Sequence, residues 1–430
     1  MGSAVQKAMS PALRSWRARV FASTWLCYVG FYLCRKPFYI AKSELGKATG
    51  WDASDLALIG TAYLIAYAAG QFIAGWAGTK GGARRLLLVG MGLSVVSNIA
   101  FGLTNSLGVF ATFMAINGLA QATGWAGTVS TMGNWFLRRE RGTVMGFWAT
   151  CFQFGGVFGN GLAAWALGRW GFEYSFFCGA GAMLLVIAFF AFNQRNEPED
   201  VGLKLPADGD EDPDQAAEIG ESTGGLRGLG WSRSTMNTVL IVGSFYFFVK
   251  FIRYALWSWV PFFLSRNYGL KGDEAGYLST VFDFCGIAGV IVCGWMSDRY
   301  FQGKRAKISM IFLVLMVCSC VLMYTAGQVA VGLFGISLGL VGFSLYGPDA
   351  LMTGAAAQDI GGRSTAMAAG IINGLGSIGA VVQELVIGRM YDASAGDLGP
   401  IFALLVGAAV LACLSLCVVL YRNKRGISDV

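Results

Sequence analysis

Runs of about 20 apolar residues with few charges recur along this chain, and they constrain its fold more than any other feature. A helix of that length crosses the hydrocarbon core of a bilayer, whereas a soluble core is built from shorter apolar segments. Only 13% of the 430 residues are charged, against about 25% in a typical soluble domain. The pattern predicts an integral, multi-pass membrane protein. It excludes soluble enzymes, disordered chains and proteins that bind nucleic acid.

Twelve of these runs are long enough to be transmembrane helices, so we expect an all-α membrane protein. The first run continues past Arg35 without a small-residue cleavage site, and we interpret it as a retained helix and not as a signal peptide. The twelve runs lie near residues 20–41, 55–78, 86–106, 109–136, 142–168, 173–193, 235–264, 274–297, 308–326, 329–355, 364–388 and 398–421.

The segment between the sixth and seventh runs has a different composition. It contains ten acidic residues and glycine-rich flanks, and such a segment buries too little apolar surface to order itself. We therefore predict an N-terminal six-helix half over residues 1–193, a flexible cytoplasmic linker over 194–234 and a C-terminal six-helix half over 235–430.

The distribution of lysine and arginine predicts the orientation of the chain in the membrane. The side that holds both termini and the linker carries 22 basic residues, and the opposite side carries six. Because basic residues accumulate in cytoplasmic loops, we expect both termini in the cytoplasm and the protein in a bacterial inner membrane. The six basic residues on the opposite side are Lys42, Lys47, Arg169, Arg266, Lys271 and Arg389.

The cysteine and histidine content argues against metal and cofactor chemistry. All ten cysteines lie in apolar runs without the spacing of zinc ligands, and the chain has no histidine to act as a ligand or a general base. Gly374-x-Gly376-x-x-Gly379 has the spacing of a dinucleotide fingerprint, but it lies inside a predicted span with no strand before it, so we interpret it as a helix-packing motif. We expect no cofactor, no metal and no catalytic residue.

Two motifs occur once in each half of the chain. The glycine- and tryptophan-containing turn at 75–80 recurs at 294–299, an offset of 219 residues (294 − 75). The pattern Arg-x-Thr-x-Met at 141–145 recurs at 363–367, an offset of 222 (363 − 141). An internal duplication of six helices predicts two pseudo-symmetric bundles around a central cavity.

Four cations lie inside the predicted spans, which are Arg35 and Lys36 in the first and Lys250 and Arg253 in the seventh. Each would cost about 2.5–3.5 kcal/mol at a helix centre if it were unpaired. Arg35 precedes the first motif by 40 residues (75 − 35) and Arg253 precedes its second copy by 41 (294 − 253), so the arginines also follow the repeat.

Arginines at matched positions would repel each other unless an anion lay between them. A guanidinium presents a planar fork of donors that fits phosphate or carboxylate oxygens, and two forks suit a doubly charged phosphate. Tyr28 and Tyr32 lie on the helical face of Arg35 and can offer hydroxyls to the same ligand, while Lys250 shares a face with Arg253. The pattern predicts an anion site near the middle of the membrane.

A purely structural ion-pair network is the alternative to anion binding. Asp283 lies in the eighth span, Asp349 in the tenth and Glu384 in the eleventh, so three acids face four cations. We expect these acids to serve as counter-charges or coupling groups, with Asp283 opposite Lys250 or another cation.

The basic turns resemble the loop signature of the major facilitator superfamily, Gly-x-x-x-Asp-Arg followed by basic residues. The copy at 294–305 is complete, whereas the copy at 75–85 has Thr79 in place of the acid. The resemblance implies a fold of two six-helix bundles. It also implies a conformational latch, whose candidate residues are Asp298, Arg299, Arg141 and Arg363.

The membrane cations carry a closer resemblance, to the organophosphate:inorganic phosphate antiporter family of glycerol-3-phosphate and hexose-6-phosphate transporters. The matching motifs are Tyr28-x-x-x-Tyr32-x-x-Arg35-Lys36, Arg253-Tyr254 with Trp259 and Pro261, Gly342-x-x-x-x-Gly347-Pro348, Arg139-Glu140-Arg141-Gly142 and Phe282-Asp283. The resemblance implies that Arg35 and Arg253 hold phosphate, with Lys36, Tyr32 and Tyr67 nearby. Gln71, Phe152 and Ser258 depart from the bacterial members, so the organic part of the substrate is not identified.

We therefore expect a secondary transporter, and not an enzyme, that exchanges a sugar phosphate or glycerol phosphate for inorganic phosphate by alternating access. Its expected partners are these small molecules and the lipid bilayer, without nucleic acid, and we expect a monomer. The alternatives are a sugar-phosphate-sensing membrane receptor and a proton-coupled transporter of another organic anion.

Overall fold

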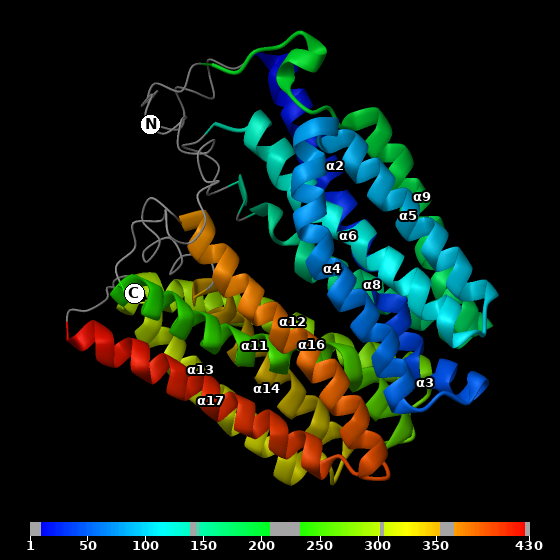
Figure 1. Ribbon diagram of the computed structural model, residues 1–430, viewed down its shortest axis with the longest axis vertical. Coiled ribbons are helices and arrows are strands. Elements are labelled where there is room, and N and C mark those ends of the chain that lie inside the picture. Colours follow the sequence, from blue (N-terminus) through cyan, green and yellow to red (C-terminus); the bar gives the residue numbers. More distant parts are fainter. Residues whose placement is uncertain are drawn as a thin grey trace. The chain divides into compact units, whose positions relative to one another are not determined.

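The computed structural model describes residues 10–137, 144–145, 147–206, 233–301, 305–352 and 365–425. Within these ranges the chain is helical and contains no strand, as Figure 1 shows, so the all-α prediction is confirmed for the described part. Nine of the described helices are long and apolar enough to cross a membrane. The remaining long helices include α6 and α8, which contain polar residues such as Asn117 and Gln153.

The helices occur in the predicted order, with bounds that differ from the predicted ones by a few residues at most ends. They are α2 (Pro11–Leu33), α3 (Lys36–Thr49), α4 (Ala53–Gly81), α5 (Ala83–Leu103), α6 (Leu107–Trp135), α8 (Cys151–Trp170), α9 (Phe172–Asn193), α11 (Arg233–Arg266), α12 (Gly272–Tyr300), α13 (Arg305–Leu322), α14 (Val331–Ala350), α16 (Thr365–Ala393) and α17 (Gly399–Lys424), with the short elements η1 (Pro198–Val201) and η3 (Met323–Gly327).

The first predicted span is in fact two helices, α2 and α3, separated at Cys34 and Arg35. Pro37 explains the break, because proline has no N–H to donate and its ring clashes with the carbonyl four residues earlier, here that of Leu33. The amide of Arg35 instead donates to the carbonyl of Tyr32 at 3.0 Å, which forms a tighter turn. Arg35 therefore lies at a helix discontinuity and not in a continuous helix.

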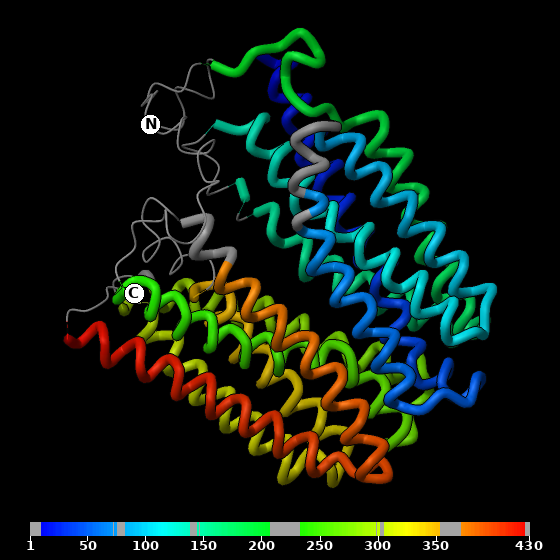
Figure 2. The backbone as a smooth tube through the Cα atoms, viewed as in Figure 1, coloured from blue at the N-terminus to red at the C-terminus, as the bar shows by residue number. Residues whose placement is uncertain are grey.

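The described chain forms two compact units, each with its own packed helices. Unit 1 comprises residues 1–37, 65–163 and 173–229, and unit 2 comprises residues 38–64, 164–172 and 230–430. Figure 2 traces the backbone, coloured by residue number from the N-terminus to the C-terminus. The division of the chain into halves at 193 and 235 stays a prediction, because α3 and the start of α4 pack in unit 2 with the helices from α11 onward.

In unit 1, α5 packs along α6, and the first helix packs against both. Cys27, Phe31 and Cys34 of the first helix region are buried with Leu87 and Met91 of α5. These two cysteines are therefore small core residues, as their apolar surroundings in the sequence predict.

In unit 2, α11 lies against α16 and α17, while α14 packs on α12 and α13. Two glycines allow α16 to approach α11 closely. A Cβ atom at Gly376 would lie 2.5 Å from the ring of Tyr246, and one at Gly379 would lie 2.3 Å from the carbonyl oxygen of Phe247. Gly376 and Gly379 of the motif are thus packing residues in the structure, as predicted from the sequence, whereas a Cβ atom at Gly374 would have no neighbour within 4 Å.

The first part of the predicted linker is ordered on unit 1. The indole of Trp135 donates to the carbonyl of Arg195 at 3.0 Å, and the amide of Arg84 donates to the side chain of Asn196 at 2.8 Å. These bonds tie residues 194–206 to the ends of α5 and α6, so the segment does not need its own apolar core. Residues 207–232 of the predicted linker lie outside the described residues, and its last two residues, 233 and 234, begin α11.

Gly379→Ala is expected to destabilise the protein, whereas Gly374→Ala is not. A methyl group at position 379 meets backbone atoms of α11, which cannot rotate away, and overpacking of this kind typically costs about 1–3 kcal/mol. At position 374 a Cβ has no neighbouring atom within 4 Å, so only the higher helix propensity of alanine acts there. Thermal unfolding of the purified variants in detergent measures the difference. Equal melting temperatures for the two variants would contradict the close approach of α16 to α11.

Candidate functional site

Arg35 is buried in unit 1, where a neutral side chain holds its guanidinium. Its Nε donates to Oε1 of Gln121 in α6 at 2.7 Å, and Arg35 as a whole is only 6% exposed. The amide of Gln121 in turn donates to Oδ1 of Asn117 at 3.1 Å. A charge-assisted hydrogen bond of this length fixes the guanidinium without cancelling its charge.

The same side chains of α5 and α6 satisfy the backbone at the helix break. The carbonyl oxygen of Cys34 accepts from the Asn98 amide at 2.9 Å and from the Asn117 amide at 3.2 Å. A carbonyl at a helix break within a membrane needs such partners, because lipid offers none. Asn98, Asn117 and Gln121 are almost completely buried.

Tyrosines surround Arg35 as the sequence predicts. The Arg35 guanidinium carbon lies 4.9 Å from the ring centroid of Tyr32 and 5.3 Å from that of Tyr67, within the range of cation–π attraction. The rings of Tyr28 and Tyr32 lie 6.2 Å apart. Unit 1 therefore brings together four of the predicted binding residues, Tyr28, Tyr32, Arg35 and Tyr67.

Lys36 is the first residue of α3 and is almost fully buried, with 1% exposure. Gly159 of α8 makes room for it, because a Cβ atom there would lie 2.9 Å from Cγ of Lys36. One turn earlier, Gly155 accommodates the ring of Tyr32 in the same way, with a Cβ position 2.8 Å from the ring. The pair Gly155 and Gly159 thus brings α8 close to the helix that carries the cations.

In unit 2, Arg253 is paired with a carboxylate. Its Nη1 lies 2.7 Å from Oδ2 of Asp349 in α14, and its side chain keeps 25% of its surface exposed. The guanidinium carbon also lies 4.7 Å from the ring centroid of Tyr346. The structure therefore gives Arg253 one of the counter-charges that the sequence analysis considers.

Asp283 and Lys250 have other partners in the structure than each other. Tyr346 donates its hydroxyl hydrogen to Oδ1 of Asp283 at 2.6 Å. Lys250 donates to Oδ1 of Asn373 at 2.8 Å and to the hydroxyl of Ser377 at 3.3 Å, both on α16. Their pairing during a transport cycle stays a prediction.

Glu384 forms a buried ion pair that the sequence analysis missed. Nζ of Lys42 lies 2.7 Å from Oε1 of Glu384, and the two side chains are 0% and 1% exposed. Ser258 also donates to Oε1 at 3.0 Å, and Gln383 donates to Oε2 at 3.0 Å. The carboxylate can approach this closely because residue 60 is glycine, where a Cβ atom would lie 2.5 Å from Oε1.

The assignment of Lys42 to a loop is wrong. Helix α3 continues to Thr49, and Nζ of Lys42 lies 3.3 Å from the ring centroid of Trp259 inside unit 2. The error arose because the apolar run ends near residue 41, whereas the helix extends beyond it. Lys42 follows the apolar run directly, so it resembles a loop charge. Its partner Glu384 lies 342 residues away, and nothing in the sequence connects the two.

Other polar residues of the site also escaped the sequence analysis. Asn117 and Gln121 lie four residues apart in an otherwise apolar segment, and Asn98 lies in the preceding helix. The polarity of these residues could have identified them, because an amide buried in a membrane helix usually hydrogen-bonds to another group of the protein. That partner is the break at Cys34 and Arg35.

Of the four predicted latch residues, the structure describes the side chain of Arg299 alone. Arg141 and Arg363 lie outside the described residues, and the side chain of Asp298 is not described. Arg299 is exposed at the end of α12. Their role stays a prediction.

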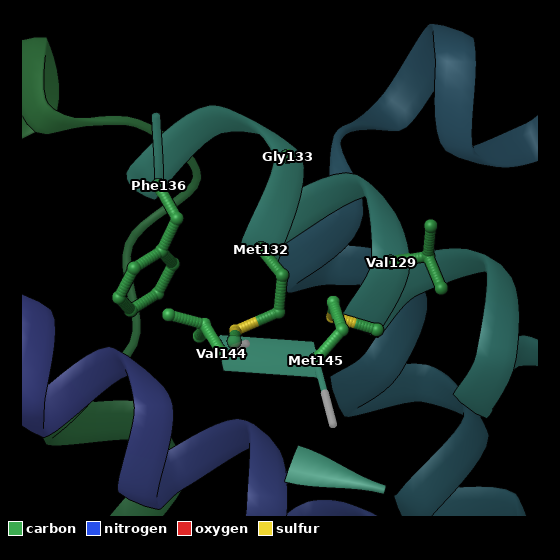
Figure 3. Close-up of a pocket in the computed structure, with 6 residues that line it drawn as sticks. All are labelled: Val129, Met132, Gly133, Phe136, Val144 and Met145. Atoms are coloured by element: carbon green, nitrogen blue, oxygen red, sulfur yellow. The ribbon is translucent and has the colours of Figure 1, made fainter. Parts of the chain in front are cut away.

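A small cavity in unit 1 is separate from these charges. It has a volume of about 140 Å³, and Figure 3 shows the residues that line it, Val129, Met132, Gly133, Phe136, Val144 and Met145. Because no charged residue lines it, it does not fit an anion.

The sequence is similar to known transport proteins over nearly its whole length. Residues 24–384 match the Major Facilitator Superfamily profile. The chain is 31% identical to the glucose-6-phosphate exchanger SLC37A2 of Bos taurus, over 95% of this chain and 94% of that protein. It is 30% identical to the glycerol-3-phosphate transporter of Bacillus subtilis, over 97% of this chain and 95% of that protein. In fold, it matches the peptide transporter POT with a TM-score of 0.74 at 13% identity, covering 96% of each chain.

Removal of either partner of the Lys42–Glu384 pair is expected to destabilise the protein strongly. Lys42→Met leaves a buried carboxylate and Glu384→Gln leaves a buried ammonium, and breaking a buried pair in this way typically costs about 3–5 kcal/mol. The double variant loses both charges together and should recover most of the stability. Thermal unfolding in detergent of the single and double variants gives the coupling between the two residues.

Lys47→Met is the matched control, because Lys47 and Glu44 also lie 2.7 Å apart but with 45% and 33% of their side chains exposed. An exposed pair contributes about 0–1 kcal/mol, so this variant should unfold close to the wild type. If Lys42→Met were no more damaging than Lys47→Met, the buried pair would not stabilise unit 2.

Proposed function

Because the chain belongs to the Major Facilitator Superfamily, we propose that it is a secondary transporter that exchanges a phosphorylated small organic molecule for inorganic phosphate. The superfamily assignment and the expected fold of two pseudo-symmetric helical bundles are both confirmed. The relatives' names, a glucose-6-phosphate exchanger and a glycerol-3-phosphate transporter, support a sugar phosphate or glycerol phosphate as the organic substrate. No enzymatic step is needed for this function.

The observation that carries the proposal is the pair of arginines at repeat-related positions. Tyr28 and Arg35 of the first helix region match Tyr246 and Arg253 of α11, each at an offset of 218 residues (246 − 28 and 253 − 35). In each unit the arginine has a tyrosine ring against its guanidinium, Tyr32 in one case and Tyr346 in the other. We take both arginines as phosphate ligands, because their planar forks match the oxygens of a phosphate dianion.

The remaining predicted residues supply further charge and hydrogen bonds. Lys36 and Lys250 add positive charge beside the two arginines, while Tyr28, Tyr32 and Tyr67 offer hydroxyls. Arg35 is bonded to a neutral amide, so that contact leaves its positive charge for an anion, whereas a phosphate at Arg253 competes with Asp349. The competition gives Asp349 its proposed role as a counter-charge that substrate displaces.

Exchange follows from the electrostatics of such a site. Without an anion the cations of the two halves repel, and closure around an empty site is unfavourable. A bound dianion removes the repulsion, so the site changes its exposure mainly when it is loaded, by rocking of residues 1–193 against 235–430. Glu384 with Lys42, and the latch candidates Asp298, Arg299, Arg141 and Arg363, would form and break contacts in this cycle.

The proposed setting is a bacterial inner membrane with both termini in the cytoplasm. The distribution of basic residues supports this orientation, with 22 on one side and five on the other once Lys42 is placed in α3. The protein acts as a monomer in this proposal, since each chain supplies both arginines.

Reconstitution into liposomes tests the exchange. Vesicles loaded with inorganic phosphate should take up labelled phosphate, glycerol-3-phosphate or glucose-6-phosphate, and vesicles without internal phosphate should not. Arg35→Lys and Arg253→Lys should each reduce uptake about tenfold or more, because a lost charge-assisted hydrogen bond is worth about 1.5–3 kcal/mol and lysine lacks the fork.

Arg14→Lys is the matched control, because Arg14 is exposed near the start of α2 and should tolerate the change. Phosphate binding without uptake would point to a sugar-phosphate receptor. Uptake that follows an imposed pH gradient and ignores internal phosphate would point to a proton-coupled transporter. Normal exchange by both the Arg35→Lys and Arg253→Lys variants would overturn the proposed roles of the arginines.

A further inference from the structure

Three buried amide side chains connect the break in the first helix with the guanidinium beside it. Asn117 donates to the carbonyl of Cys34, Gln121 donates to Asn117, and Arg35 donates to Gln121, at 3.2, 3.1 and 2.7 Å. Asn98 supports the same carbonyl from α5. The two neighbouring residues of the break, one through its backbone and one through its side chain, are thus bound to one face of α6.

The hydrogen-bond chemistry allows only one orientation of this chain of amides. A guanidinium can only donate, so Gln121 must present its oxygen to Arg35 and its NH₂ group to Asn117. Asn117 must then present its oxygen to Gln121 and its NH₂ group to the carbonyl of Cys34, which can only accept. Each hydrogen bond from Arg35 through Gln121 and Asn117 to the carbonyl of Cys34 has a donor and an acceptor in this single arrangement, which restrains the side chains of the chain.

We propose that Gln121, held by Asn117, is a positioning residue that fixes the Arg35 guanidinium for anion binding and preserves its positive charge. The hydrogen bond at Nε restrains the plane of the guanidinium and uses none of the donors on its two terminal nitrogens. A carboxylate at position 121 could make the same hydrogen bond, but its negative charge would oppose the anion. The inference rests on the proposed function and adds the residue that determines how strongly unit 1 attracts phosphate.

A comparison of Arg35 with Arg253 supports the proposed role of Gln121. The repeat-related Arg253 has the carboxylate of Asp349 at the same 2.7 Å at which Arg35 has the amide of Gln121. The distances are equal, but Arg35 uses Nε and a neutral partner, whereas Arg253 uses Nη1 and a charged one. The proposal therefore predicts that Arg35 contributes more to anion binding than Arg253.

Gln121→Glu is the decisive variant, because it keeps an acceptor for Nε of Arg35 and adds a negative charge, although it also loses the NH₂ group that donates to Asn117. We expect it to bind inorganic phosphate at least tenfold more weakly than the wild type, measured by calorimetric titration of the full-length protein in detergent at a temperature well below unfolding. Gln121→Leu and Asn117→Leu both remove the Gln121–Asn117 hydrogen bond without adding charge, and they should weaken binding by a smaller factor.

Gln194→Glu is the matched control, because Gln194 is a fully buried glutamine of unit 1 that donates to Thr131 and not to an arginine. It should bind phosphate as the wild type does, even if it is less stable. A role of Gln121 in folding alone predicts lower melting temperatures for its variants with unchanged phosphate affinity.

The outcomes separate the inference from the proposed function. Wild-type protein that binds neither inorganic phosphate nor glycerol-3-phosphate would overturn the proposed function itself. Wild-type protein that binds phosphate, together with a Gln121→Glu variant of equal affinity, would overturn only the positioning role. If Gln121→Glu does not fold, unchanged affinity of both Gln121→Leu and Asn117→Leu would overturn it equally.

Discussion

A charge or an unpaired backbone group inside a membrane must find a partner within the protein, because lipid supplies none. The hydrogen bonds and ion pairs of the buried groups in this structure meet that requirement in two ways. Arg35 and the carbonyl of Cys34 are satisfied by neutral amides, whereas Arg253 and Lys42 are satisfied by carboxylates. The sequence repeat places cations at matched positions, but the chosen partners make the two arginines electrostatically different.

The sequence was sufficient for the helices, their order and the membrane cations, because these depend on local composition and spacing. The break at Cys34 could have been read from Pro37, but the apolar run continues across it and conceals it. Partners were harder to predict, since Asp349 reaches Arg253 across 96 residues and Asp283 bonds to Tyr346 and not to Lys250. Such choices depend on the rotation of each helix about its axis, which hydrophobic runs do not specify.

The buried ion pair of Lys42 and Glu384 must be solvated if the helices that carry it separate. Both side chains are excluded from solvent, so separating α3 from α16 requires water to reach two charges that have almost no exposed surface. Ser258 and Gln383 lower this barrier, because they hydrogen-bond to the carboxylate and can keep part of its solvation when the lysine leaves. The pair therefore favours one arrangement of unit 2 without making it permanent.

Gly60 has a consequence for how this protein can evolve. The space that a side chain would fill there is occupied by the Glu384 carboxylate, so any larger residue at position 60 would push the acid off Lys42. Conversely, a homologue that has lost the acid no longer needs a glycine in α4. Positions 42, 60 and 384 should therefore change together across relatives, although they are scattered over three helices and nearly the whole length of the chain.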